Sequence, residues 1–234
     1  MSRVHFLNAG IIVCVAVLSI CYGWSQPEPP PDQFPLAKGS YWIYEGERKW
    51  QGHGPKVFSK EITCRTEVMD RIERTGVVAA VVRGYPVCGE DLEVLISADG
   101  HHFYLLPAES SVLKRLKDPN DALVDLARDD QIELVLPLVK GERFCEASQM
   151  IRPDGFYCSV VEEQRREKLR GVSGISGDLE RTAYQITFRT LPDYTAIDFV
   201  PGVGITSYDY VHHGTIDEEH LKLVEFHNGK APDH

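Results

Sequence analysis

A long alternating segment is the feature of this sequence that most constrains the fold. Residues 57–72, VFSKEITCRTEVMDRI, alternate in character. One face would carry the apolar residues Phe58, Ile62, Cys64, Val68 and Ile72. The other face carries charged and hydroxyl residues: Ser59, Glu61, Thr63, Arg65, Glu67 and Arg71. A period of two is typical of a strand with one buried face. The segment therefore predicts a sheet-based fold, with Cys64 turned toward the core.

Neighbouring segments extend this sheet. Residues 40–50, SYWIYEGERKW, are rich in aromatic residues, and residues 77–84, VVAAVVRG, are almost entirely apolar, as in a strand inside a sheet. Segments 93–97 and 101–106 flank an Asp-Gly pair and predict a hairpin. We therefore expect a mainly β, antiparallel meander.

One segment departs from the strand pattern. Residues 118–128, DPNDALVDLAR, begin with Asp118, a residue that can cap a helix, and Pro119, which suits the first helical position. Ala122, Leu123 and Leu126 would then form the apolar side. We predict the main helix here, within a helical linker of about 109–128 that separates two strand-rich halves.

The two halves resemble each other in layout. FPLAKGSYW at 34–42 matches LPLVKGERF at 136–144, and each is followed by a cysteine-bearing strand, an apolar strand and a hairpin with a glycine turn. These parallels predict a degenerate internal duplication with half-repeats at about 34–107 and 136–213. The two meanders would form a curved sheet or open barrel. Chance similarity between β-hairpins is the alternative.

The N-terminal segment has the composition of an export signal. Arg3 precedes the apolar run 9–20, and cleavage after Ser25 would leave small residues at both positions that need them. We expect a signal peptide at 1–25, a proline-rich leader at 26–33, a single β-rich domain at 34–228 and a flexible tail at 229–234.

Two alternatives to simple cleavage remain open. LSIC, ending at Cys21, is similar to a bacterial lipobox, although Ile20 stands where a small residue is expected. The apolar run could also stay as an uncleaved anchor. The protein is thus expected to be exported and to be periplasmic or secreted, with a lipid anchor in the outer membrane as the alternative.

Cysteine usage fits an oxidising compartment. Cys64, Cys88, Cys145 and Cys158 would remain after cleavage, and four cysteines allow three pairings. Local pairing predicts disulfides Cys64–Cys88 and Cys145–Cys158, with a free core thiol at Cys64 as the alternative. No close Cys-x-x-Cys pair of the kind that holds structural zinc is present.

Two segments carry a resemblance to known proteins. FPLAKGSYWIYEG near the start and FVPGVGITSYDY near the end resemble a broad group of uncharacterised bacterial exported, lipoprotein-like β proteins, which have an early PLxxGxxWxY segment and a late PGVG segment. The resemblance implies bacterial origin, export and a β-rich fold. It implies no activity.

The overall charge limits the partners. The formal net charge of −10 disfavours nucleic acid, which is bound through basic surface. It also disfavours docking to an anionic membrane, so we expect membrane association only through a lipid on Cys21.

Glycines and histidines in residues 199–215 carry little catalytic signal. PGVGITS lacks the third glycine of a dinucleotide loop and predicts a turn between strands. His212 and His213 are adjacent on an expected strand and would point to opposite faces, so they cannot together bind one ion. We predict no metal site, no cofactor and no catalytic residue.

Aromatic residues supply the candidate binding site. Tyr208, Tyr210 and His212 share one face of an expected strand, and Trp42 and Tyr44 share a face of another. Such side chains either line a ligand cavity or fill a β core.

The sequence favours a non-enzymatic binding or envelope-associated module. Its partner would be an apolar small molecule or an envelope protein. The alternative is an exported hydrolase whose site is assembled from distant histidine and carboxylate residues.

Overall fold

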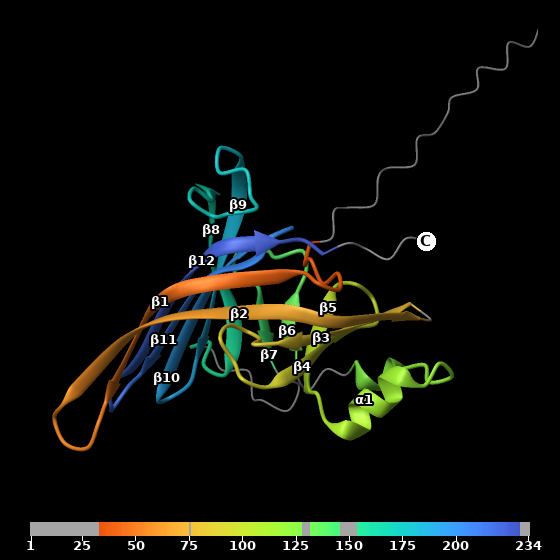
Figure 1. Ribbon diagram of the computed structural model, residues 1–234, viewed down its shortest axis with the longest axis horizontal. Helices are drawn as coiled ribbons and strands as arrows, with labels where there is room; N and C mark the ends of the chain where they lie inside the picture. Colours follow the sequence, from red (N-terminus) through yellow and green to blue (C-terminus); the bar gives the residue numbers. More distant parts are fainter. Residues whose placement is uncertain (1–32, 75, 128–131, 146–153, 230–234) are drawn as a thin grey trace, which may run out of the picture. The chain divides into compact units, whose positions relative to one another are not determined.

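Twelve antiparallel strands in one sheet form most of the described chain in the computed structural model, which describes residues 33–74, 76–127, 132–145 and 154–229 (Figure 1). The elements are β1 Tyr41–Gln51, β2 Val57–Arg74, β3 Val77–Arg83, β4 Leu92–Ser97, β5 His102–Pro107, α1 Ser110–Lys117, the 3-10 helix η1 Val124–Leu126, β6 Ile132–Val135, β7 Arg143–Cys145, β8 Cys158–Lys168, β9 Glu180–Arg189, β10 Asp193–Val200, β11 Gly204–His212 and β12 Asp217–His227.

The strand order divides the sheet into two meanders. The order is β6-β5-β4-β3-β2-β1-β12-β11-β10-β9-β8-β7, so β1 to β6 and β7 to β12 each follow one another directly. The meanders join through the pairing of β1 with β12. This arrangement confirms the predicted mainly β, antiparallel meander.

The sheet curves until its two edges share one core. Leu134 of β6 and Phe144 of β7 belong to the same buried cluster, to which every strand contributes. Among the described residues, β6 and β7 form no ladder with each other. The curved sheet or open barrel predicted from the sequence is therefore confirmed, with a gap between its two edge strands.

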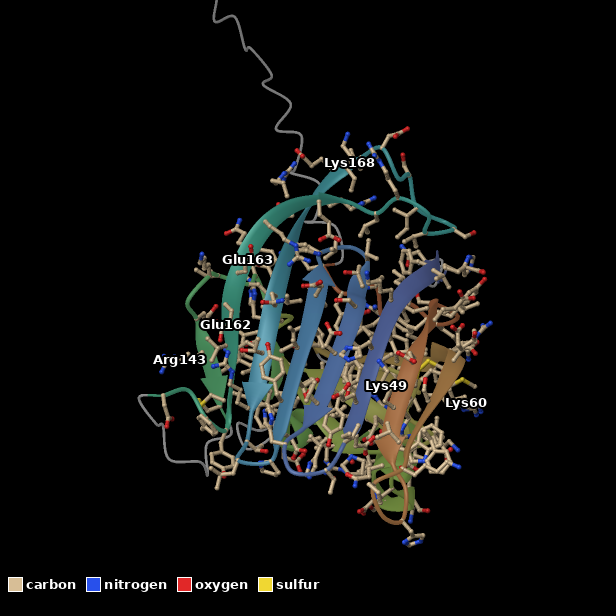
Figure 2. The ribbon with its side chains drawn as sticks, turned by 90° about the vertical axis from the view of Figure 1, so that its left-hand side faces the viewer. Lys49, Lys60, Arg143, Glu162, Glu163 and Lys168 are labelled. Carbon is tan, nitrogen blue, oxygen red and sulfur yellow. A yellow bond between two sulfur atoms is a disulfide. The ribbon has the colours of Figure 1, made fainter. Side chains whose placement is uncertain are left out.

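Antiparallel order brings several turns to one margin of the sheet. The β1–β2, β9–β10 and β11–β12 turns lie side by side along the lower edge of Figure 2. We call this edge the hairpin margin, because the long β1–β2 hairpin belongs to it.

The long alternating segment forms β2, but the apolar side chains at its two ends pack against different clusters. The register of β2 against β3 shifts between Val68 and Asp70, which leaves Met69 as a bulge. A bulge reverses the facing of the residues beyond it. Ile62 and Cys64 pack against the core inside the sheet, whereas Ile72 packs against a second cluster outside it. The prediction that Ile72 shares the face of Val68 was wrong for this reason.

The main helix lies before the segment predicted for it. Helix α1 ends at Lys117, and the backbone N–H of Asp118 donates to the carbonyl of Arg115 (3.1 Å). A proline disfavours helical conformation in the residue before it. Asp118-Pro119 therefore ends this helix and does not begin one. The helix still lies in the predicted linker between the two halves.

Helix α1 explains why β3 is apolar throughout. Leu116 belongs to the outer cluster, together with Val77, Ala79 and Val81 of β3. Residues between these, such as Ala80, face the core inside the sheet. Both faces of β3 are thus covered, which removes the usual polar alternation.

The two Pro-Leu-x-Lys-Gly segments have the same backbone geometry. The N–H of Gly39 donates to Val68 (2.9 Å), and the N–H of Gly141 donates to Val161 (2.8 Å). Both glycines have positive φ, 84° and 87°. In each half the strand bulges directly after the valine. Corresponding positions in the two meanders therefore make corresponding contacts.

Two disulfides fasten the sheet. Cys64 of β2 is bonded to Cys88 in the β3–β4 connection, with the Cα atoms 5.3 Å apart. Cys145 of edge strand β7 is bonded to Cys158 of β8, with the Cα atoms 4.4 Å apart. These are the local pairings expected from the sequence, and they leave Cys64 without a free thiol.

The expected signal peptide, most of the proline-rich leader, Cys21 and nearly all of the expected tail lie outside the described residues. Within the described ranges, no helix has the length and hydropathy needed to cross a membrane.

Candidate functional site: a pocket inside the curved sheet

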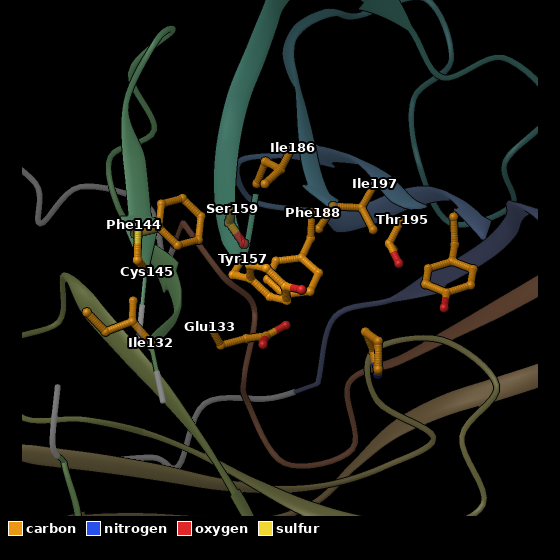
Figure 3. A pocket seen from close by; sticks show the side chains of 12 residues that line it. Ile132, Glu133, Phe144, Cys145, Tyr157, Ser159, Ile186, Phe188, Thr195 and Ile197 are labelled. Carbon is orange, nitrogen blue, oxygen red and sulfur yellow. The ribbon is translucent and has the colours of Figure 1, made fainter. Parts of the chain in front are cut away.

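A pocket of about 240 Å³ lies inside the sheet, between its two edge strands (Figure 3). Its lining combines aromatic and aliphatic side chains with a carboxyl group and several hydroxyl groups: Pro86, Ile132, Glu133, Phe144, Cys145, Tyr157, Ser159, Ile186, Phe188, Thr195, Ile197 and Tyr208. Apolar walls with a few polar groups are typical of small-molecule sites, whose volumes commonly begin at about 300 Å³.

The gap between β6 and β7 leaves space for this pocket. Most lining residues come from the ends of β6 to β10 that meet the hairpin margin, such as Cys145 at the end of β7 and Phe188 near the end of β9. The Cys145–Cys158 disulfide holds the β7 wall against β8. The pocket is therefore built by the second meander and completed by β6.

A bulge turns Glu133 toward the pocket. In the pairing of β5 with β6, Phe103 is opposite Leu134 and Tyr104 is opposite Ile132, which leaves Glu133 as the extra residue. Bulges commonly redirect a side chain near a binding site. The carboxylate of Glu133 accepts a hydrogen bond from the hydroxyl of Tyr85 (2.8 Å).

The interior environment favours the protonated forms of this group and of the neighbouring tyrosines. Burial raises the pKa of the Glu133 carboxyl, and the Glu93 carboxylate raises it further, against the opposing effect of the Tyr85 hydrogen bond. Burial also raises the pKa of Tyr85 well above its usual value and that of Tyr208 to about 12. Both phenols are therefore neutral hydrogen-bond donors at neutral pH.

Three hydroxyl groups on the strands of the lining are available to a ligand. Among the described residues, the side-chain hydroxyls of Ser159, Thr195 and Tyr208 have no hydrogen-bond partner. They come from three different strands and line the same pocket as Glu133. Figure 3 labels Glu133, Ser159 and Thr195. A molecule in the pocket would meet both donors and acceptors there.

The structure separates the five aromatic and histidine residues proposed as ligand contacts. Tyr208 lines the pocket. Trp42 and Tyr44 lie in the core, where they are 3% and 1% exposed. The Trp42 indole donates to the carbonyl of Val203 (2.5 Å), and the Tyr44 hydroxyl donates to that of Ile205 (3.0 Å). Both line only a void of about 10 Å³, room for about one water molecule.

Tyr210 and His212 lie at the pocket's border. The Tyr210 hydroxyl donates to Oδ1 of Asp193 (2.7 Å), and Nδ1 of His212 lies 2.9 Å from the same oxygen. These two bonds lower the pKa of the Asp193 carboxyl, His212 contributing most. Tyr210 is paired with Thr195, so this cluster extends the pocket's face toward the hairpin margin.

The histidine doublet forms no joint site. His212 is the last residue of β11, and His213 follows it and is exposed. No group of three histidine, cysteine, aspartate or glutamate side chains in the described ranges is arranged to hold a metal ion. The Gly-x-Gly pair forms the turn between β10 and β11, where Gly202 and Gly204 have φ of 79° and 97°.

Sequence reasoning missed most of the pocket. Glu133 carried an available signal, because it is the only charged residue in the apolar run IELVLPL at 132–138. Tyr157, Phe188 and Thr195 carried none, since each follows the ordinary pattern of a strand or turn.

The fold and the pocket define a class: an antiparallel β protein whose curved sheet contains a pocket of about 240 Å³. No protein-family model and no curated protein matches the chain. A crystal structure of a Bacteroides fragilis protein, described as exported and as having a YmcC-like fold, is similar with a TM-score of 0.39 and 11% identity; the match covers 83% of this chain and 98% of that one. A Parabacteroides distasonis protein described as a lipoprotein matches with a TM-score of 0.34 and 12% identity, over 83% of this chain and 97% of that one.

Proposed function

We propose that this protein is an extracytoplasmic binding module that takes a small, mainly apolar ligand into the pocket between its edge strands. The observation that carries the proposal is the lining, in which aromatic and aliphatic walls surround Glu133 and three unbonded hydroxyls. A cavity that served only as a packing defect would have no reason to gather polar groups from four strands.

The polar groups define the ligand more closely. One oxygen of Glu133 accepts from Tyr85, which leaves the carboxyl group able to bond a further partner. The rings of Tyr157 and Phe188 suit a flat apolar body. The ligand class is therefore an apolar, preferably aromatic compound that bears a hydroxyl or amino group.

Export is part of the proposal. The N-terminal segment has the composition of a signal peptide, and disulfides such as Cys145–Cys158 persist in oxidising compartments outside the cytoplasm. A periplasmic or secreted protein fits both observations, and a lipid on Cys21 would tether it to the outer membrane.

We also propose that the two meanders arose by internal duplication. The matching hydrogen bonds of Gly39 and Gly141 support this origin, as does the bulge that follows Val68 and Val161. The two halves would then differ in the pocket, because the second meander supplies most of its wall.

A fluorescent apolar amine tests the binding function. N-phenyl-1-naphthylamine has an aromatic body and one N–H group, and its emission rises on transfer from water to an apolar site. We expect saturable binding at one site per chain. The substitution Ser159→Phe fills the pocket and should weaken binding at least about tenfold, a loss of about 1.4 kcal/mol. Ser111→Phe, at an exposed position of α1, is the matched control.

The result that would overturn the binding function is equally specific. Either non-saturable fluorescence with the wild type, or equal affinity in Ser159→Phe and Ser111→Phe, would show that the probe does not occupy this pocket. Thermal unfolding of both variants shows whether the fold is retained.

The hydrolase alternative rests on the Asp193–His212 pair beside the pocket. Such a pair orients an imidazole for base catalysis, but a nucleophile must lie within hydrogen-bond reach of it. Among the described residues, no serine, threonine or cysteine side chain is bonded to His212. Ester hydrolysis that disappears in His212→Ala would favour this alternative over a binding module.

A further inference from the structure

We propose that the hairpin margin docks onto an anionic phospholipid bilayer, with the β1–β2 hairpin as the main contact. This inference goes beyond the proposed ligand binding and does not depend on it. It rests on the local charge, the exposed apolar side chains and the position of the pocket.

The hairpin reverses the charge of the chain. Residues 48–60, RKWQGHGPKVFSK, contain four cations and no carboxylate, although the whole chain has a formal net charge of −10. Arg48 is paired with Asp217 (3.5 Å) and Lys49 with Glu47 (2.8 Å). Within the described part of the chain, Lys56 and Lys60 form no ion pair. The hairpin therefore presents uncompensated positive charge.

Aromatic side chains lie among these cations. The rings of Trp50 and Phe58 are stacked with centroids 5.7 Å apart, and the Lys56 ammonium lies 4.7 Å from the centroid of Phe58. Phe58 is 37% exposed and the adjacent Val57 is 45% exposed. Aromatic rings with neighbouring lysines are the side chains that favour the interface between lipid headgroups and acyl chains.

The neighbouring turns continue this apolar surface. Leu191, in the β9–β10 turn, is 71% exposed, and Ile216, in the β11–β12 turn, is 37% exposed. Figure 2 shows these two turns beside the β1–β2 hairpin along the lower edge. The backbone N–H of Gln51 donates to the carbonyl of Ile216 (2.6 Å), which joins the hairpin to the β11–β12 turn. The apolar side chains thus project from one margin.

This combination points to a bilayer, because it needs a partner that is negative at its surface and apolar just below it. The negative charge of the whole chain opposes such docking only weakly. At physiological salt, the repulsion between exposed charges is screened beyond about 8 Å. The expectation that only a lipid on Cys21 could bring the protein to a membrane considered net charge alone. The positive charge of residues 48–60 is the basis for proposing a second route to the membrane.

The pocket lies near the same margin. Phe188, which is part of its lining, lies two residues before the β9–β10 turn, and Cys145 and Ser159 flank the β7–β8 connection. A protein docked in this way would hold its pocket near the bilayer surface, where apolar compounds accumulate.

Vesicle flotation tests the docking. We expect the purified protein to bind vesicles of phosphatidylcholine with about one third phosphatidylglycerol, to bind phosphatidylcholine alone much more weakly, and to lose binding as salt increases. The double substitution Lys56→Gln/Lys60→Gln should weaken binding about 30-fold, at about 1 kcal/mol per charge. Lys140→Gln/Lys168→Gln, the same charge change at exposed sites on the opposite margin, should leave it unchanged.

Tryptophan quenching locates the contact. Brominated lipids should quench the tryptophan fluorescence of the wild-type protein. The Trp50→Phe variant should still float with the vesicles but lose most of this quenching. Equal binding to neutral and anionic vesicles, or equal losses in the two lysine pairs, would overturn the proposal. Because probe binding in Ser159→Phe is measured without lipid, failure of either proposal leaves the other one testable.

Discussion

Glu133 is the residue at which local geometry and chemistry are most closely linked. The bulge in β6 turns its side chain inward, Tyr85 supplies one hydrogen bond, and burial raises the pKa of its carboxyl group. An ionisable group held in this way destabilises the fold when it loses its proton. Its retention inside the sheet is better explained by ligand contact than by stability.

The substitution Glu133→Gln tests this environment. Because the pKa is raised in the folded protein, the folded state holds the proton more tightly than the unfolded chain, whose carboxyl titrates near about 4.3. The free energy of unfolding of the wild type should therefore fall as pH rises from that value through the raised folded value. The substituted amide keeps an acceptor for the Tyr85 hydroxyl and cannot ionise.

Urea unfolding of both proteins between acid and neutral pH measures the effect. The variant should gain stability relative to the wild type as pH rises above the carboxyl's unfolded value. A difference that stays constant across this range would contradict a raised pKa at Glu133. The contributions of other titrating groups to the pH dependence cancel in the comparison, because both proteins contain these groups.

The histidine doublet supplies a second prediction at this scale. His212→Ala removes the bond to Asp193 and should cost about 1 kcal/mol of unfolding free energy. His213→Ala, at an exposed position, should change stability by less than about 0.5 kcal/mol. Elemental analysis of protein purified without a tag or chelator should find no stoichiometric metal in the wild type. Zinc, copper or iron that is lost in either variant would instead favour the hydrolase.

At the scale of elements, the β7–β8 pair is the least supported part of the pocket wall. Strand β7 spans only Arg143–Cys145, and among the described residues it pairs with β8 alone. The Cys145–Cys158 disulfide closes the connection between them, and Cys145 itself lines the pocket. The geometry of the site therefore depends on a bond that forms only in an oxidising compartment.

Replacing the two disulfides separately should distinguish their roles. Cys145→Ser/Cys158→Ser should lower the free energy of unfolding by about 3 kcal/mol, because the unfolded chain gains conformational freedom. Cys64→Ser/Cys88→Ser should lower it by a similar amount. Only the first change should also weaken probe binding, since only that bond supports the pocket wall. Non-reducing peptide mapping of the wild type checks the pairing, and free thiols at Cys145 and Cys158 would contradict it.

The elements also show how far sequence patterns lead. Alternation located β2. Aromatic richness located β1, an apolar run located β3, and the Asp-Gly turn located β4 and β5. The helix was predicted too late in the chain, because Asp118-Pro119 fits the start of a helix as well as the end of one. The actual helix begins after Glu109 without a side-chain cap, so it lacked the usual starting signal.

The pocket could not be predicted in the same way. Its lining depends on which strands become edges and on the position of one bulge, and both follow from long-range pairing. Tyr208 was selected because it is aromatic and shares a face with Tyr210. Trp42 and Tyr44 fit the same description, yet they fill the core, because alternation does not show whether an inward side chain meets a cavity or another residue.

At the scale of the whole molecule, processing of the N-terminal segment decides where the protein acts. We expect the exported protein to lack residues 1–25, since that segment alone has the architecture of a signal. Intact mass of protein recovered from the extracytoplasmic fraction measures this directly. A mass that includes a diacylglyceryl group on Cys21 would identify a lipoprotein, and a mass that retains residues 1–25 would contradict cleavage.

The central pairing of β1 with β12 has a consequence for the order of folding. Each meander consists of strands that follow one another along the chain, so its hairpins can form from local contacts. The pairing of β1 with β12 instead brings together distant parts of the chain, such as Tyr41 and Glu225, whose side chains are hydrogen-bonded although they lie 184 positions apart. Closing so long a loop is slow compared with forming a hairpin. We therefore expect two separate half-sheets to form first, and the protein to reach its native state only when the last strand of the chain joins the first.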